Sequence, residues 1–242
     1  MPITSLFALS ETRQKQLNSY ADKYSITAYS SFEYPRIPPN EVLKTGKNGK
    51  VLIFTYGSLL NKESASHSLS DQAMKTYSPA VALSVKRLFN RYVPTTKKWG
   101  VPKNPLDVAM LNLLPCSEPS AIVNGVMMWV DEEDLKNLLT REEGYDLIPV
   151  FVISWNEAID PLITNPPIEV AYTFSASLNA REGIHYTRPN IDPVPKYAIA
   201  CMKGAAQYGQ EYLNFWLYTT YLSDGKTKFI CWKNKHLNKA LN

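Results

Sequence analysis

Short apolar runs, separated by glycine, proline and charged turns, divide the middle of the chain and predict a series of strands. The runs with the length and composition of buried strands lie at residues 51–54, 80–89, 108–114, 121–130, 147–155 and 169–175. A turn with prolines at both ends, residues 115–119, separates two of these runs. We therefore expect 108–114 and 121–130 to form an antiparallel hairpin.

Other segments have the apolar spacing of helices, with one face suited to packing on a sheet. These segments are residues 10–24, 59–69, the stretch after Asp131, 196–208 and 211–221. Asp131 is a suitable helix cap, and the acidic residues that follow it occupy the favourable first turn. Strands that precede a short helix, more strands and then two late helices indicate an α+β fold.

The connections between most predicted strands are too short for helical crossovers, so we expect a mixed, largely antiparallel sheet. A small β-barrel with flanking helices fits the strand count. We divide the chain into an N-terminal extension at 1–48, a core domain at 49–224 and a basic C-terminal tail at 225–242. The prolines and thin helical stripe of the extension suit an arm packed on the core, or a segment that recruits a protein partner.

Composition narrows the class of protein. Of the 242 residues 45% are hydrophobic and 20% are charged, as in globular proteins, and the net charge of +4 is mild. Much of this charge lies in the tail, and no basic stripe interleaved with aromatic residues continues into the core. We therefore expect no nucleic acid as partner. No apolar stretch approaches the roughly 20 residues that span a bilayer, and the N-terminus lacks a basic segment typical of signal peptides. We expect no membrane partner and a cytoplasmic location.

Cysteine and histidine spacing argues against disulfides and metals. The 3 cysteines are far apart and odd in number, and the 3 histidines have no neighbouring ligand at metal spacing. We expect free thiols, no metal and no cofactor. A Ser58 nucleophile assisted by His67 or His185 stays open, although Tyr56-Gly57-Ser58-Leu59 lacks the G-x-S-x-G pattern. The aromatic residues of 211–221 are expected to pack on the core.

Two segments could carry chemistry. After the strand at 51–54, Tyr56-Gly57-Ser58 forms a glycine turn before a predicted helix, and free N–H groups at such a turn can bind an anion. The second segment is the helix end Arg141-Glu142-Glu143, and Gly144 is well placed as the residue just past that end. The negative end of the helix dipole is expected to raise a carboxyl pKa there, which a general base can use.

Together these segments resemble the γ-glutamylcyclotransferase superfamily, which includes the ChaC and AIG2-like branches. The likeness rests on Tyr-Gly-Ser-Leu after the first strand and Leu-Leu-Thr-Arg-Glu-Glu-Gly-Tyr at 138–145, and it spans residues 51–222. Further similar pieces are a strand beginning Val-x-Gly at 123–125 and a late helix that contains Tyr197. Leu139 departs from the family, which often has aspartate at that position.

The resemblance implies an enzyme that releases 5-oxoproline from a γ-glutamyl amine or amino acid by internal attack of the α-amine. Glu142 matches the general acid/base; Glu143 is the runner-up, because the spacing to Tyr145 is one residue shorter than in the ChaC branch. The backbone of Tyr56, Gly57, Ser58 and Leu59 matches the loop that holds the substrate carboxylate. Tyr197 matches a pocket tyrosine, and an ordinary core tyrosine is an equal alternative.

The leaving group stays open among glutathione, γ-glutamyl amino acids and γ-glutamylamines. Glutathione is not favoured, because the segments typical of the ChaC branch are only partly present. The alternative function is a catalytically silent AIG2-like module that binds a small ligand or a protein partner through the same pocket.

Overall fold

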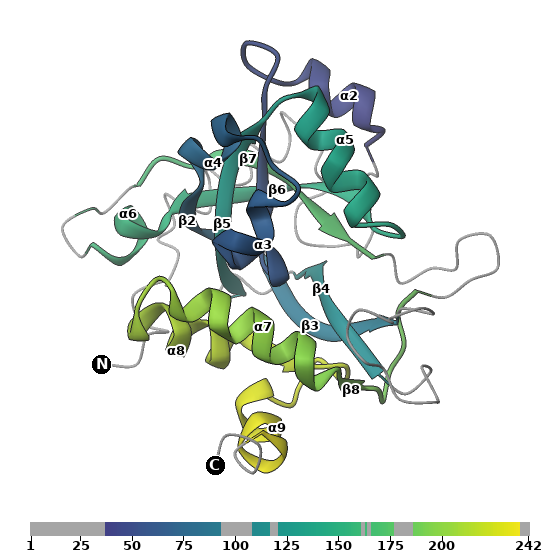
Figure 1. Cartoon of the computed structure of the whole chain (residues 1–242). Coiled ribbons are helices and arrows are strands. Elements are labelled where there is room, and N and C mark those ends of the chain that lie inside the picture. The colour runs from purple at the N-terminus through teal and green to yellow at the C-terminus, as the bar shows by residue number, and fades with distance from the viewer. Residues whose placement is uncertain are drawn as a thin grey trace.

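The computed structural model describes residues 37–92, 108–116, 121–160, 163, 166–176 and 186–237. The predicted helix at 10–24 and His185 lie outside this range. Within it, two β-sheets form the centre of the molecule, and helices cover them on several sides (Figure 1). No helix in these described segments is long and apolar enough to cross a membrane.

The first sheet is a closed barrel with the strand order β1-β5-β2-β6-β7. Its strands are β1 (Val51–Thr55), β2 (Ser78–Leu83), β5 (Ile122–Val130), β6 (Asp146–Ser154) and β7 (Glu169–Ser175). Every neighbouring pair is antiparallel except β1 and β7, which pair in parallel to close the barrel. The expected α+β class and largely antiparallel small barrel are therefore confirmed, and the barrel is closed.

The second sheet has the order β8-β4-β3-β9. Its strands are β3 (Val85–Tyr92), β4 (Val108–Pro115), β8 (Asp192–Pro193) and β9 (Thr220–Leu222). The predicted hairpin between 108–114 and 121–130 is wrong. β4 pairs with β3 and β8, while β5 pairs with β1 and β2, so neither strand has an edge left for the other.

The single run at 80–89 is divided between the two sheets. β2 ends at Leu83 and β3 begins at Val85, and Ser84 between them has a φ of 58°. A left-handed residue bends an extended chain sharply, so the run leaves the barrel and enters the second sheet. Hydrophobicity alone does not mark this bend, because the residues on both sides of Ser84 are buried.

Helices follow the predicted pattern with local differences. They are α2 (Pro39–Lys44), the 3-10 helix η2 (Ser58–Leu60), α3 (Lys62–Ser66), α4 (Asp71–Thr76), α5 (Glu132–Arg141), α6 (Trp155–Ile159), α7 (Pro195–Ala206), α8 (Gln210–Thr219) and α9 (Phe229–His236). Asp131 caps α5 as expected, accepting a hydrogen bond from the Asp134 N–H at 3.0 Å. The helix predicted at 59–69 is instead broken into short pieces, because Asn61 and Ser70 each cap a new helix.

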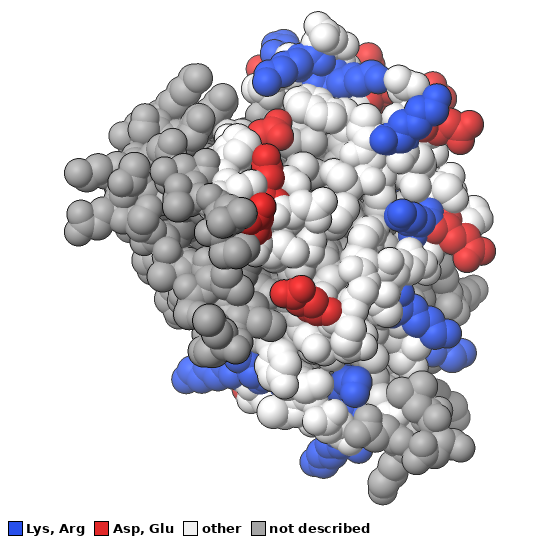
Figure 2. All heavy atoms as spheres, turned by 90° about the vertical axis from the view of Figure 1, so that its left-hand side faces the viewer, with Lys and Arg blue, Asp and Glu red and all other residues white. Residues whose placement is uncertain are grey.

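The two late helices, α7 and α8, lie side by side beneath the barrel in Figure 1. Tyr212, Phe215 and Trp216 of α8 are buried, which confirms the expected core packing, whereas Tyr218 is 57% exposed. In the segment after 225, α9 buries Phe229 and Trp232 against the core. Figure 2 shows acidic and basic side chains interspersed with uncharged surface on one face of the molecule.

Candidate active site

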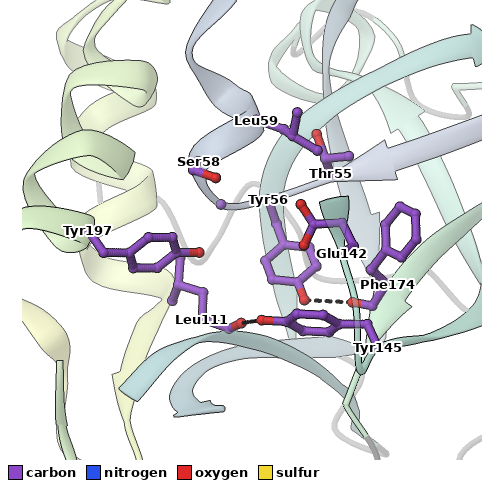
Figure 3. A pocket seen from close by; sticks show the side chains of 10 residues that line it. Thr55, Tyr56, Ser58, Leu59, Leu111, Glu142, Tyr145, Phe174 and Tyr197 are labelled. Atoms are coloured by element: carbon purple, nitrogen blue, oxygen red, sulfur yellow. Dashed lines mark hydrogen bonds between the residues drawn. The ribbon is translucent and has the colours of Figure 1, made fainter. Parts of the chain in front are cut away.

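A pocket opens where the end of β1 meets the end of α5, with an empty volume of about 310 Å³ that includes its open mouth. Its walls come from β1, the turn after it, β4, α5, β7 and α7 (Figure 3). The lining residues are Thr55, Tyr56, Gly57, Ser58, Leu59, Leu111, Glu142, Tyr145, Phe174 and Tyr197. The two sequence motifs therefore share one pocket, although about eighty residues separate them in the chain.

The turn after β1 lines the pocket with Tyr56, Gly57, Ser58 and Leu59. The Leu60 N–H donates to the Gly57 carbonyl at 3.0 Å and closes η2. Within the described parts of the chain, the N–H groups of Gly57, Ser58 and Leu59 have no hydrogen-bond acceptor. Trp216 contacts the start of the same turn, since its indole N–H donates to the Tyr56 carbonyl at 3.4 Å. Such a run of free donors suits an anionic or developing negative oxygen.

The helix end places the two candidate glutamates differently. Glu142 is the residue at which α5 ends, and its N–H donates to the Leu138 carbonyl at 2.8 Å. Its side chain is 21% exposed and lines the pocket, with Oε1 3.5 Å from Nε of Arg141. Glu143 is exposed and does not line the pocket; its carbonyl accepts a hydrogen bond from Arg91 at 3.0 Å. Gly144 lies just past the end of α5 and has a φ of 81°, a left-handed conformation that glycine adopts readily.

Arg141 connects the two motifs. Its guanidinium donates to the Ser64 carbonyl at 2.7 Å, to Ser64 Oγ at 2.9 Å and to Ser68 Oγ at 3.1 Å. It also reaches Ser58 Oγ at 3.3 Å. The end of α5 is thereby attached to η2 and α3, and Arg141 helps to hold Glu142 near the Gly57–Leu59 turn.

Two tyrosines of the pocket use their hydroxyl groups for structure. The Tyr56 hydroxyl donates to the Phe174 carbonyl and the Tyr145 hydroxyl to the Leu111 carbonyl, each at 2.6 Å. Burial raises the pKa of Tyr56 and of Tyr145, and the Glu142 charge raises both further. Both phenols therefore stay neutral near pH 7, and Glu142 is the acidic side chain that lines the pocket.

The late tyrosine also lies in the pocket. Tyr197, near the start of α7, is 4% exposed, and burial raises the pKa of its hydroxyl. Figure 3 shows it on the opposite side of the pocket from Glu142. Its ring also packs edge-on against Phe89, with ring centroids 6.4 Å apart, so it contributes to both the pocket wall and the core.

Sequence reasoning missed Thr55, Leu111, Tyr145 and Phe174 as lining residues. Thr55 lies directly before the Tyr56–Leu59 motif, and Tyr145 is the last residue of the 138–145 motif. A polar residue at the end of an apolar strand was an available signal for Thr55. Leu111 and Phe174 lie within apolar strands and look like any core residue. The suggested serine chemistry gains no support: His67 bonds the Glu63 carbonyl on an exposed helix, and it does not line the pocket.

No group of three or more His, Cys, Asp or Glu side chains in the described segments could share a metal ion. No protein-family model matches the sequence, and no curated protein matches it either.

Solved structures do match. The fold is similar to a γ-glutamyl cyclotransferase with a TM-score of 0.50 and 19% identity, covering 69% of this chain and 86% of that one. A yeast γ-glutamyl cyclotransferase specific to glutathione matches with a TM-score of 0.48 and 16% identity, over 71% of this chain and 96% of that one. An AIG2-like protein from Mus musculus matches with a TM-score of 0.33 and 15% identity, over 60% of this chain and 88% of that one. On the match with a TM-score of 0.50, the chain has the γ-glutamylcyclotransferase fold.

Proposed function

We propose that this protein belongs to the γ-glutamylcyclotransferase superfamily and releases 5-oxoproline from a γ-glutamyl amine or amino acid. The observation that carries the proposal is that the Glu142 side chain lines one pocket together with Gly57, Ser58 and Leu59, whose N–H groups have no acceptor within the described residues. One group can move a proton and the others can stabilise a negative oxygen, which are the two requirements of acyl transfer to an amine.

The proposed reaction starts when Glu142 accepts a proton from the α-ammonium group of the substrate. The free amine then attacks the γ-carbonyl carbon of the same molecule, so the substrate itself supplies the proximity. A C–N bond forms, and backbone N–H groups of the turn stabilise the resulting oxyanion. As the original γ-amide C–N bond breaks, Glu142 returns its proton to the leaving nitrogen. The ring nitrogen then gives up the extra proton that it carries after the attack, and this proton leaves with the released amine as an ammonium group. The products are 5-oxoproline and a free amine or amino acid.

Glu142 is preferred to Glu143 because a general base must reach the proton that it removes. The Glu142 side chain lines the pocket, whereas Glu143 is exposed outside it. Arg141 is within ion-pair distance of the Glu142 carboxylate, and its remaining hydrogen bonds keep it fixed to η2 and α3.

The test is 5-oxoproline release from a panel of glutathione, γ-glutamyl amino acids and γ-glutamylamines. Replacing Glu142 with glutamine keeps the shape of the side chain and removes its basicity. We expect Glu142→Gln to lower kcat by roughly 10²–10⁴-fold on the substrate that the wild-type protein turns over. The matched control is Glu143→Gln, which is expected to keep activity within about twofold because that side chain is exposed.

Two outcomes would count against the proposal. If Glu142→Gln keeps full activity while Glu143→Gln loses it, the acid/base assignment is wrong. If folded wild-type protein releases 5-oxoproline from no member of the panel, the alternative of a silent binding module becomes the better explanation of the pocket.

A further inference from the structure

Thr55 is the last residue of β1 and lines the pocket directly before the Tyr56–Leu59 turn. It is 4% exposed. Figure 3 shows its side chain on the same side of the pocket as Glu142 and opposite Tyr197. The backbone position is fixed by the barrel, because Thr55 pairs with Val126 of β5. A side chain held in this way can be a rigid contact for a ligand.

The Thr55 hydroxyl differs from the other hydroxyl groups of the pocket. The Tyr56 and Tyr145 hydroxyls donate to backbone carbonyls, and Ser58 Oγ accepts from Arg141. Thr55 Oγ1 is buried and has no hydrogen-bond partner within the described residues. Leaving a buried polar atom unsatisfied costs about 1–3 kcal/mol, so such an atom beside a pocket is suited to a ligand or a bound water.

We propose that Thr55 Oγ1 accepts a hydrogen bond from the amino group of the substrate and orients it beside Glu142. The inference rests on the proposed function. An ammonium group has three N–H donors, so one can face Glu142 and another can face Thr55. After Glu142 has taken its proton, rotation about the C–N bond of the amine turns the new lone pair toward the γ-carbonyl and brings one of the two remaining N–H groups to Thr55. Thr55 is thus a substrate-positioning residue.

The test compares Thr55→Val, which removes the hydroxyl at nearly constant volume, with Thr55→Ser, which keeps it. Thr173→Val is the matched control, because Thr173 is fully buried, its Oγ1 also has no partner in the described chain, and it does not line the pocket. Binding of L-glutamate and of glutarate, which lacks the amino group, is measured by calorimetry on the full chain. Thr55→Ala replaces the valine variant if the latter does not fold.

We expect Thr55→Val to weaken L-glutamate binding by about 10-fold, the usual effect of losing one hydrogen bond to a charged group. Glutarate binding should change by less than about twofold in the same variant. Thr55→Ser and Thr173→Val should bind both probes as the wild-type protein does. If turnover is measurable but L-glutamate binds too weakly, the same comparison applies to KM, which should rise by about 10-fold in Thr55→Val.

Equal L-glutamate affinity in Thr55→Val and the wild-type protein would overturn this inference and leave the proposed function standing. Equal losses in Thr55→Val and Thr173→Val would also overturn it, since the effect would then come from the barrel and not from the pocket. A wild-type protein that neither binds L-glutamate nor releases 5-oxoproline would overturn the proposed function, and this inference with it.

Discussion

An ideal Cβ atom on Gly57 would lie 2.6 Å from the Tyr197 hydroxyl oxygen and 3.8 Å from a methyl carbon of Leu111. Glycine at this position therefore reflects a close approach between the turn and α7. We predict that Gly57→Ala destabilises the fold by about 1–3 kcal/mol, the usual cost of overpacking. It should also lower turnover, because the turn or Tyr197 must shift within the pocket. Urea unfolding and the release assay measure the two effects.

The cause of the Gly57→Ala effect can be separated from a general loss of stability. In a Tyr197→Phe background the hydroxyl that meets the new methyl group is gone. Gly57→Ala should therefore lower the free energy of unfolding by less in that background. Tyr197→Phe alone is the reference for the double variant. Purely additive losses in stability would contradict the steric explanation.

At the residue scale, the sequence predicted the parts of the pocket that depend on backbone chemistry or charge. Gly57 and Ser58 follow a strand, and Glu142 ends a helix, so their neighbours in the chain reveal their setting. Phe174 and Leu111 contribute pocket walls and backbone carbonyls that bind tyrosines. Nothing local distinguishes them, because their role depends on residues that approach from other strands.

At the scale of elements, Arg141 fastens α5 to η2 and α3 through hydrogen bonds to Ser58, Ser64 and Ser68. Lysine keeps the charge but lacks the planar fork of donors. We predict that Arg141→Lys lowers turnover by more than about 10-fold, because Glu142 and the turn lose their fixed relation. Stability should fall by about 1–3 kcal/mol, since partly buried acceptors lose their donors.

The control for Arg141→Lys is Lys136→Gln, an exposed position on the same helix. It changes a charge of α5 without touching η2 or α3, and both kcat and unfolding midpoint should stay near the wild-type values. If the two variants lose the same activity, the loss would come from a general disturbance of α5 and not from the connection made by Arg141.

The boundaries of elements were predicted well where local signals exist and poorly where tertiary pairing decides. Asp131 caps α5 and β7 spans Glu169–Ser175, both as expected from sequence. The expected hairpin fails because β4 and β5 belong to different sheets, and strand partners are chosen by packing rather than by proximity in the chain. The bend at Ser84 could not be predicted either, because the residues on both sides of it are buried and resemble one continuous strand.

At the scale of the whole molecule, a buried arginine joins the two sheets and α8. Arg87 of β3 is fully buried and donates to Thr220 Oγ1, to the Asn124 carbonyl and to the Trp216 carbonyl. Its guanidinium also stacks on the Trp216 ring, 4.7 Å from the centroid. Because the Trp216 indole donates to the Tyr56 carbonyl, Arg87 is linked through Trp216 to the turn that lines the pocket.

Burial of ionisable groups makes the stability of the whole fold change with pH in the alkaline range. Burial raises the pKa of the Cys201 thiol from its usual 9.0 to about 12. The folded protein thus keeps a proton that the unfolded chain releases, so stability is full below pH 9 and falls as pH rises toward 12. Burial also raises the pKa of Tyr212, which adds to the loss at higher pH. Burial lowers the pKa of Arg87 to about 9, an effect of opposite sign.

Comparing variants gives the Cys201 contribution together with its interactions with Arg87 and Tyr197, since all other ionisable groups are common to both proteins. We predict that between pH 9 and pH 10 the free energy of unfolding falls by about 1 kcal/mol more in the wild-type protein than in Cys201→Ala. Urea unfolding at each pH under reducing conditions measures the difference. Cys231→Ala removes an exposed thiol and should follow the wild-type curve. A constant offset between wild type and Cys201→Ala across this range would mean that the thiol ionises in the folded protein as readily as in the unfolded chain, and the burial argument would fail.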